Sequence, residues 1–158
     1  MVESLVEQII HKIDQAVQLY YRLILVVAPS GMGKTMALRE VAKRTKFRYI
    51  NINLELSQRL LGLTERQRSL QVSRLLNKIV DENGAQVVLL DNIELLFDTS
   101  LKQDPLRLLQ GISRNRTVVA SWSGSIENEH LIYAQPDHPE YRRYPTTGLL
   151  VIGVEQRR

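Results

Sequence analysis

The sequence predicts an α/β fold in which helices cover both faces of a parallel β-sheet, giving three layers. Two observations favour it. Short apolar segments rich in β-branched residues, of which residues 23–28 (LILVVA) are the clearest, alternate along the chain with segments of helical periodicity. The apolar segments are continuous, as in strands buried on both faces of a parallel sheet. The 158 residues suffice for one such domain, and we expect residues 1–158 to form it.

The N-terminal third of the chain begins with an amphipathic helix predicted over residues 2–20, which we expect to pack on the domain core. Its apolar positions recur at helical spacing and are Val2, Leu5, Val6, Ile9, Ile10, Ile13 and Val17. The strand at 23–28 is followed by a predicted helix at 35–45, in which Met36, Leu38, Val41 and Ala42 can face a core. Residues 47–54 alternate in polarity and predict a second strand.

The rest of the chain continues the alternation of helices and strands. Thr64 and Gln67 form a capping box that opens a helix ending at Asn83-Gly84. The apolar side of this helix consists of Leu70, Leu75, Leu76, Ile79 and Val80. Further strands are predicted at 85–92, 116–124 and 148–154, and a helix at 104–113 has Pro105 in its first turn. Five strands therefore predict a five-stranded parallel sheet.

The connection between the first strand and its helix carries most of the phosphate-binding pattern G-x-x-x-x-G-K-[ST]. A triphosphate needs a concave run of backbone N–H groups, a helix N-terminus, a lysine charge and a hydroxyl for Mg²⁺. The first glycine is replaced by Ala28, which mainly affects the turn out of the strand. We therefore predict an ATP site with Thr35 as a magnesium ligand. Its predicted residues are Ala28, Pro29, Ser30, Gly31, Met32, Gly33, Lys34, Thr35 and Met36.

Acidic residues follow the third predicted strand, where ligands bind in α/β sheets. Asp91 ends the apolar run and is predicted to hold Mg²⁺. Many hydrolases of this class place a glutamate next, to polarise the attacking water, but this chain has Asn92. Asparagine can orient a water without taking its proton, so Glu94 is the nearest alternative base. Ordinary hydrolysis and slow or partner-dependent hydrolysis both remain open.

Two further pairs of polar residues are candidates for contact with the γ-phosphate. Ser121 and Ser123 lie on one face of the fourth predicted strand, so either could contact this phosphate or its water. Arg142 and Arg143, just before the last strand, are placed where an arginine finger could reach the nucleotide of a neighbouring subunit. Polar surface is the alternative interpretation of both pairs.

Composition excludes several classes of protein. The chain has no cysteine, so disulfides and thiolate metal sites are absent. Its apolar runs are too short to span a bilayer, and the N-terminus lacks the basic region of a signal peptide, so we expect no membrane contact. The net charge of +4 permits DNA contact, but the basic residues are spread out and give no positive argument for it.

The loop APSGMGKT, the segment LLDNIELLF and the order of elements resemble the AAA+-related P-loop ATPase core. This resemblance implies a three-layer P-loop NTPase (AAA+/ASCE-like) fold with strand order 5-1-4-3-2. The sequence departs from full AAA+ proteins because it ends at the fifth predicted strand, so we expect neither their C-terminal helical lid nor the arginine that such a lid supplies. Residues 51–76 and 120–154 more specifically resemble the BrxF family, small P-loop proteins of type 3 BREX phage-defence systems. That resemblance implies a cytoplasmic bacterial ATPase acting with a larger ATPase and a DNA methyltransferase.

Three functions therefore stay open at the level of sequence. The first is an ATP-driven switch or motor subunit that self-associates when nucleotide is bound. The second is a small-molecule phosphotransferase of the nucleotide-kinase type, for which residues 55–70 supply arginines, although the apolar residues around them favour a docking segment. The third is a nucleotide-binding module that does not hydrolyse ATP.

Overall fold

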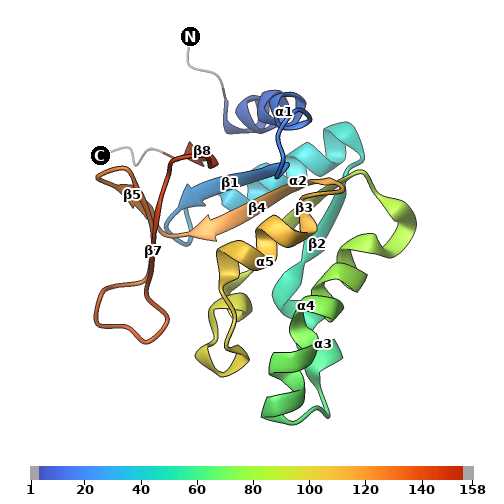
Figure 1. Ribbon diagram of the computed structural model, residues 1–158. Coiled ribbons are helices and arrows are strands. Elements are labelled where there is room, and N and C mark those ends of the chain that lie inside the picture. Colours follow the sequence, from blue (N-terminus) through green and yellow to red (C-terminus); the bar gives the residue numbers. More distant parts are fainter. Residues whose placement is uncertain (1–3, 155–158) are drawn as a thin grey trace.

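One central sheet organises the molecule (Figure 1). The computed structural model describes residues 4–154, and within them five strands pair in the order β2-β3-β4-β1-β8, with every neighbouring pair parallel. The predicted fold class and the strand order implied by the family resemblance are confirmed. The strands are β1 (Leu23–Ala28), β2 (Arg48–Asn51), β3 (Val87–Asp91), β4 (Thr117–Ser123) and β8 (Leu150–Gly153).

Helices cover both faces of this sheet, because side chains on each strand alternate between two separate apolar clusters. The helices are α1 (Leu5–Ala16), α2 (Lys34–Thr45), α3 (Ile52–Leu60), α4 (Glu65–Asp81) and α5 (Pro105–Ile112), with short 3-10 turns η1 (Glu82–Gly84), η2 (Glu94–Phe97) and η3 (Thr99–Leu101). Ile24 and Val26 of β1 belong to the cluster that contains residues of α1 and α2, whereas Leu25 and Val27 belong to the cluster that contains residues of α3, α4 and α5.

The chain after α5 contains no helix up to residue 154, the last that the structure describes. A helical lid is therefore absent from the described part of the chain. None of the helices in residues 4–154 combines the length and the apolar character that a bilayer span requires.

A second sheet, which the sequence did not predict, stands beside the first (Figure 1). Its antiparallel strands are β5 (Ser125–Glu127), β6 (His130–Tyr133) and β7 (Arg142–Pro145). The two residues between β5 and β6, Asn128 and Glu129, both have positive φ, as a type I′ hairpin turn requires. Glutamate is unusual at such a position, and the strands have only three or four residues, so the sequence carries little signal for this sheet.

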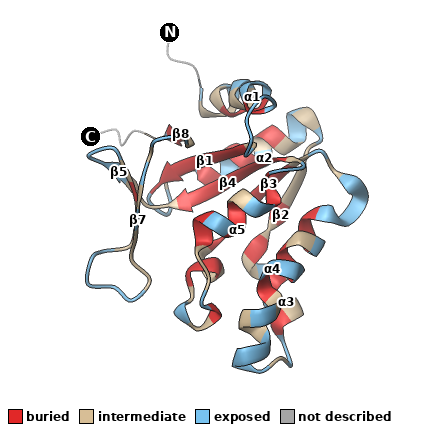
Figure 2. Cartoon of the chain, in the orientation of Figure 1, coloured by how far each residue is buried: buried red, intermediate tan, exposed pale blue. Residues whose placement is uncertain are grey.

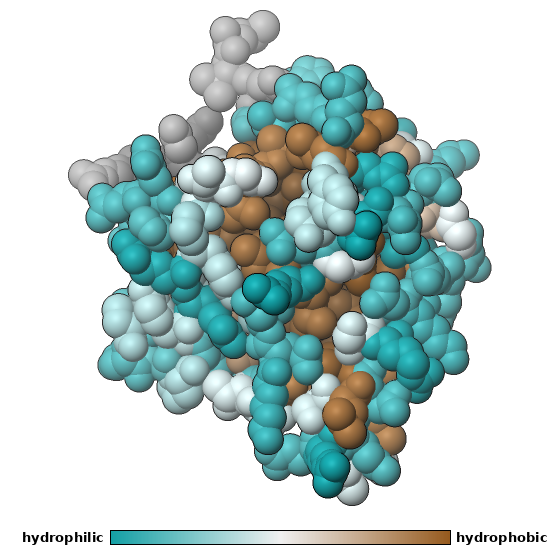
Figure 3. Space-filling view, viewed as in Figure 1, coloured by the Kyte–Doolittle hydropathy of each residue, from teal (hydrophilic) through white to brown (hydrophobic). Residues whose placement is uncertain are grey.

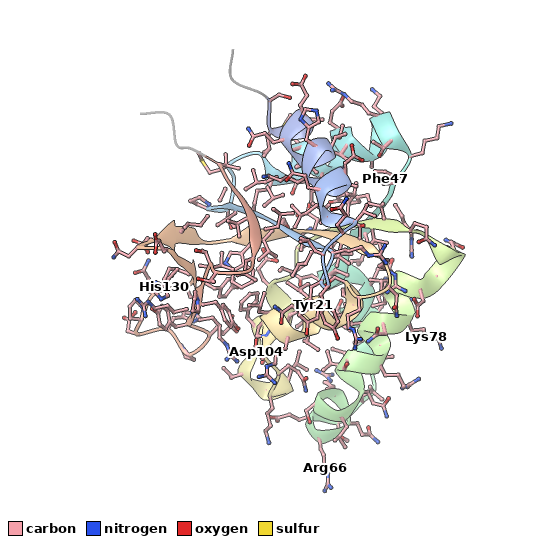
Figure 4. All side chains as sticks on the ribbon, turned by 45° about the horizontal axis from the view of Figure 1, so that its top comes forward. Tyr21, Phe47, Arg66, Lys78, Asp104 and His130 are labelled. Atoms are coloured by element: carbon pink, nitrogen blue, oxygen red, sulfur yellow. The ribbon has the colours of Figure 1, made fainter. Side chains whose placement is uncertain are left out.

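Aromatic side chains join the second sheet to the rest of the molecule. The ring of Tyr133 stacks on Phe97 at 3.6 Å between centroids, and both rings contact the fully buried Trp122 of β4. The indole N–H of Trp122 donates to the carbonyl oxygen of Ile132 at 3.1 Å. The Tyr144 hydroxyl donates to Asp104, the residue that caps α5 (labelled in Figure 4), at 2.8 Å. The second sheet is thus anchored to β4, η2 and the start of α5.

Most predicted element boundaries agree with the structure within two residues, but two differ by more. The helix predicted at 2–20 is α1, which begins at Leu5 and ends at Ala16; Val2 lies outside the described residues. The strand predicted at 47–54 ends at Asn51, because the Asn51 side chain accepts a hydrogen bond from the N–H of Leu54 and so begins α3. The alternation of polar and apolar residues in 47–54 therefore continues from the strand into the first turn of α3.

Figure 2 shows buried and exposed residues alternating along the helices, and three apolar residues predicted to face a core are among the exposed ones. Met36 is 77% exposed because it projects from the first turn of α2 beside the loop. Leu70 is 71% exposed because it lies on the face of α4 opposite the buried Val72 and Leu76. Val17 follows the end of α1 and is 58% exposed.

Hydrophilic residues dominate the face of the molecule seen in Figure 3, and apolar residues are visible in a band between α1 and α5. At the edge of the main sheet, Leu149 and Val151 are only partly buried against the core. The sheet is therefore less completely covered at β8 than at its centre.

The carboxyl ends of the parallel strands meet at one edge of the main sheet. Register places Ala28 opposite Ser123 and Asn51 opposite Asp91. Ligands bind at this edge in α/β sheets. The second sheet, marked by His130 in Figure 4, lies on this side of the molecule, and Phe47, just before β2, lies on the opposite side. The fold therefore gathers the predicted site residues between the loop after β1 and the ends of β3 and β4.

Candidate functional site

The loop between β1 and α2 adopts the backbone that a phosphate cradle needs. Gly31 and Gly33 have φ of 82° and 89°, a region that residues with a side chain rarely adopt, and Gly33 directly precedes α2. Ala28 is the last residue of β1, paired in register with Ser123, and has no positive φ. The alanine at the first glycine position is thus an ordinary strand residue and does not prevent the loop from forming.

Lys34, the first residue of α2, lies inside this loop and is only 6% exposed. Its Nζ donates hydrogen bonds to the carbonyl oxygens of Ala28 and Pro29 at 2.8 and 2.9 Å. Burial lowers the pKa of the Lys34 ammonium, while the nearby charges of Glu94 and Asp91 act in the opposite direction. The loop therefore holds the lysine at the place where a bound phosphate would lie.

Asp91 ends β3 almost fully buried, and four donors hold its carboxylate. The hydroxyls of Thr35 and Tyr49 donate to Oδ2 at 2.6 and 2.7 Å, and the Ser121 hydroxyl and the N–H of Asn92 donate to Oδ1 at 2.8 and 3.0 Å. Burial alone would raise the pKa of Asp91, but these hydrogen bonds outweigh it and lower the pKa below its ordinary value. Asp91 is therefore ionised at neutral pH.

Glu94, the first residue of η2, is held from two sides. Its Oε1 accepts a hydrogen bond from the Ser123 hydroxyl at 3.1 Å, and its Oε2 lies 3.4 Å from the side-chain nitrogen of Asn53. Asn53 also accepts from the N–H of Leu95 and donates its own N–H to the carbonyl oxygen of Asn92. The N-terminal turn of α3 therefore fixes the segment that follows β3.

Asn92 turns the chain at the end of β3. It has a positive φ of 52°, a conformation that asparagine tolerates better than most residues, and it redirects the backbone from β3 towards η2. Glu94 follows two residues later as the first residue of η2.

A cavity of about 280 Å³ brings most of the predicted residues together. It is lined by Ser30, Gly31, Gly33, Lys34, Thr35, Met36, Asp91, Asn92, Glu94 and Ser123. Ala28 and Pro29 support it from behind by accepting the hydrogen bonds of Lys34. Met32 lies in the loop without lining the cavity.

The two predicted arginines do not line this cavity. Arg142 is partly buried on β7, where its guanidinium donates to the carbonyl oxygen of Gln103 at 2.9 Å. Arg143 is exposed, with one guanidinium nitrogen 3.3 Å from the ring of His130. Only Arg143 is therefore placed to meet another molecule without a change in the second sheet.

Sequence reasoning missed Tyr49 and Asn53 as site residues. They alternate with apolar residues in the segment 47–54, so a polar face was visible in the sequence. The residues that they contact were not visible in the sequence, because Asp91 lies 42 positions from Tyr49 and Glu94 lies 41 positions from Asn53. The pairing of β2 with β3 brings Tyr49 to Asp91, and the start of α3 directly after β2 brings Asn53 to Glu94.

The oxygen donors of this site suit magnesium. Thr35 supplies a hydroxyl and Asp91 a carboxylate, and hard oxygen ligands are the ones that Mg²⁺ prefers. Within residues 4–154 no group of three or more histidine, aspartate or glutamate side chains could enclose a metal. Mg²⁺ commonly binds through one or two protein ligands together with phosphates and water, so a pair of donors is sufficient.

Comparison with known proteins places this geometry in a family. Residues 24–119, from β1 to β4, match the family model described as ATPase family associated with various cellular activities (AAA). No curated protein matches the chain.

Two solved structures share the fold. The structure of C. elegans PCH-2 aligns with a TM-score of 0.51 and 16% identity over 97% of this chain and 42% of that one. A structure titled as a DNA replication initiation factor aligns with a TM-score of 0.53 and 13% identity over 98% of this chain and 48% of that one. The chain thus spans less than half the length of these structures. Since the AAA model covers more than half of its residues, including the phosphate loop and Asp91, the chain belongs to the AAA family of ATPases.

Proposed function

We propose that the chain binds ATP with Mg²⁺ and hydrolyses it, acting as a switch or motor subunit that changes state with its nucleotide. The observation that carries the proposal is Glu94. A carboxylate lines the same cavity as Lys34 and Thr35 and is fixed by Ser123 and Asn53, which is the arrangement a general base for an attacking water needs. A site that only binds nucleotide has no need of it.

The charges of the cavity support binding of ATP together with a divalent cation. Among the side chains that line it, Lys34 is the one cation, and Asp91 and Glu94 are two carboxylates. A triphosphate entering alone would meet net negative charge, so a cation on Thr35 and Asp91 would offset the repulsion. Mg²⁺ there would supply charge neutralisation of the phosphates, while Lys34 and the loop N–H groups orient them.

Self-association is part of the proposal because the cavity lacks a second cation for the γ-phosphate. We propose that Arg143 of a neighbouring copy supplies it. Exposure of Arg143 on the second sheet supports this role, and the occupied guanidinium of Arg142 argues against that residue.

The biological setting we propose is a bacterial BREX phage-defence complex in the cytoplasm, with a larger ATPase and a methyltransferase as partners. Its support is the resemblance of residues 51–76 and 120–154 to the BrxF family. The first of these stretches covers α3, which contains Asn53, and most of α4. The second covers Ser123 and the whole second sheet.

Product analysis with purified protein and ATP–Mg²⁺ tests the biochemical part. The proposal expects ADP and orthophosphate without any acceptor molecule. A phosphotransferase would form ADP only with an acceptor, and a binding module would form neither product. Lys34→Ala should abolish detectable ATP binding with the fold retained, because it removes a charged contact to the phosphates in a nearly buried site.

Lys43→Ala is the matched control, since it removes an exposed lysine from the same helix. Its ATP affinity should equal that of the wild type. Unchanged ATP affinity in folded Lys34→Ala protein would overturn the nucleotide-site assignment itself.

A further inference from the structure

Tyr49 reaches the carboxylate of Asp91 from the neighbouring strand. Its hydroxyl donates to Oδ2 at 2.7 Å, the same oxygen that accepts from Thr35 at 2.6 Å. Ser121 and the N–H of Asn92 occupy Oδ1 in the same way. Each oxygen of Asp91 therefore has two donors, and Tyr49 is the member of this set that comes from β2.

The phenol of Tyr49 is itself held in place. Backbone pairing of β2 with β3 fixes Tyr49 beside Leu89 and Asn51 beside Asp91. The guanidinium of Arg39, on α2, lies over the Tyr49 ring at 5.3 Å from its centroid. Burial and the hydrogen bond to Asp91 raise the pKa of the Tyr49 phenol, with Arg39 acting in the opposite direction. The hydroxyl is thus a protonated donor at neutral pH.

We infer that Tyr49 is a positioning residue for magnesium, which orients the Asp91 carboxylate towards Thr35 and so sets the affinity of the site for the metal. The inference rests on the proposed function. Groups that hydrogen-bond to a metal ligand fix its orientation, and their loss typically weakens metal affinity about 10- to 100-fold. Tyr49 does not itself line the cavity and reaches it only through Asp91, so its effect on nucleotide in the absence of metal should be small.

Tyr49→Phe tests this inference because it removes only the hydroxyl and keeps the ring under Arg39. Binding of a non-hydrolysable ATP analogue is measured by calorimetry, first in EDTA and then across a titration of Mg²⁺. The affinity in EDTA should stay within about twofold of the wild type, and the Mg²⁺ concentration for half-maximal enhancement should rise about tenfold.

Tyr144→Phe is the matched control, because it removes a hydrogen bond of the same kind, from a phenol to the carboxylate of Asp104, away from the cavity. Its Mg²⁺ midpoint should equal that of the wild type. Arg39→Ala, which releases the Tyr49 ring but keeps its hydroxyl, should shift the midpoint in the same direction by less, and this variant carries the test if Tyr49→Phe does not fold.

An unchanged Mg²⁺ midpoint in Tyr49→Phe would overturn the inference and leave the proposed function intact. Equal weakening in EDTA and in Mg²⁺ would overturn it as well, since Tyr49 would then act on the nucleotide or the fold. If the wild-type chain bound no nucleotide under either condition, the proposed function would fail, and this inference with it.

Discussion

The hydroxyl of Thr35 donates to Oδ2 of Asp91 at 2.6 Å, and this contact joins the start of α2 to the end of β3. It is one of four hydrogen bonds to an almost fully buried carboxylate. The two residues predicted to bind magnesium therefore contact each other directly, and the ionised form of Asp91 contributes to the stability of the fold.

The depressed pKa of Asp91 predicts a pH dependence. A group whose pKa is lower in the folded than in the unfolded chain adds stability above its unfolded pKa, and that stability is lost as the pH falls through the folded value. The wild type should be more stable than Asp91→Asn at neutral pH, and the difference should shrink once the pH falls below about 4, where unfolded carboxylates are protonated. Urea unfolding of both proteins across this range measures it. A difference that stays constant would show that the charge of Asp91 is not stabilised in the fold.

Glu94 and Asn92 should respond differently to substitution. Glu94→Gln keeps the shape and the contact with Ser123 but cannot take a proton, so ATP affinity should stay within a few-fold while turnover falls about 10²- to 10⁴-fold. Asn92→Gly is the control, because glycine adopts the positive φ of Asn92 without strain. It should keep turnover within several-fold of the wild type. Single-turnover assays at saturating ATP compare the two variants. A larger loss of turnover in Asn92→Gly than in Glu94→Gln would show that the assignment of Glu94 as the base is wrong.

Gly124 should be intolerant of a side chain. A Cβ at Gly124 would overlap the carbonyl oxygen of Ile132 and lie 2.9 Å from the indole nitrogen of Trp122, so it would break the hydrogen bond that ties β4 to β6. Gly124→Ala should lower the free energy of unfolding by more than about 2 kcal/mol. Gly111→Ala is the control: it lies within α5 with nothing near the added carbon, and should add about 0.5–1 kcal/mol. Chemical unfolding compares them, and equal stability of the two variants would contradict the packing described for the second sheet.

The parts of the site that the sequence could predict are those set by local pattern. Lys34 and Thr35 follow from the loop between a strand and a helix, and Asp91 and Ser123 from the rule that parallel strands end at one edge. The main sheet was predictable for a similar reason, because continuous apolar runs such as 23–28 have few alternatives.

The rest depended on contacts between distant segments. Asn53 looked like a strand residue because residues 47–54 alternate, and only the cap at Asn51 turns them into a helix that points Asn53 at Glu94. The second sheet has short polar strands, and its stability comes from Trp122 and Tyr133, whose contact no local pattern reports. Which of Arg142 and Arg143 is the exposed one likewise depended on contacts such as that between Arg142 and Gln103.

The last prediction separates these two arginines. Arg143 is exposed on β7, whereas Arg142 is bonded to Gln103, so the proposed contact with a neighbouring nucleotide falls to Arg143. An arginine finger is worth about 10³ or more in rate, while an exposed ion pair contributes less than about 1 kcal/mol. Arg143→Ala should therefore keep ATP affinity and lose the dependence of turnover on protein concentration. Arg142→Ala should instead lower stability by about 1.5–3 kcal/mol, the range for a hydrogen bond to a charged group, with turnover of the folded protein retained.

A mixing experiment tests whether the arginine acts between copies. Arg143→Ala keeps an intact nucleotide site, and Lys34→Ala keeps an intact Arg143, so each lacks what the other supplies. Mixing the two inactive variants should restore part of the turnover, because a Lys34→Ala copy can present its arginine to the nucleotide of an Arg143→Ala copy. Mixing Arg143→Ala with a Lys34→Ala, Arg143→Ala double variant should restore none. Normal turnover by Arg143→Ala alone, or a wild type that stays monomeric with ATP–Mg²⁺ at high concentration, would contradict the trans contact. The second charge on the γ-phosphate would then have to come from a different protein.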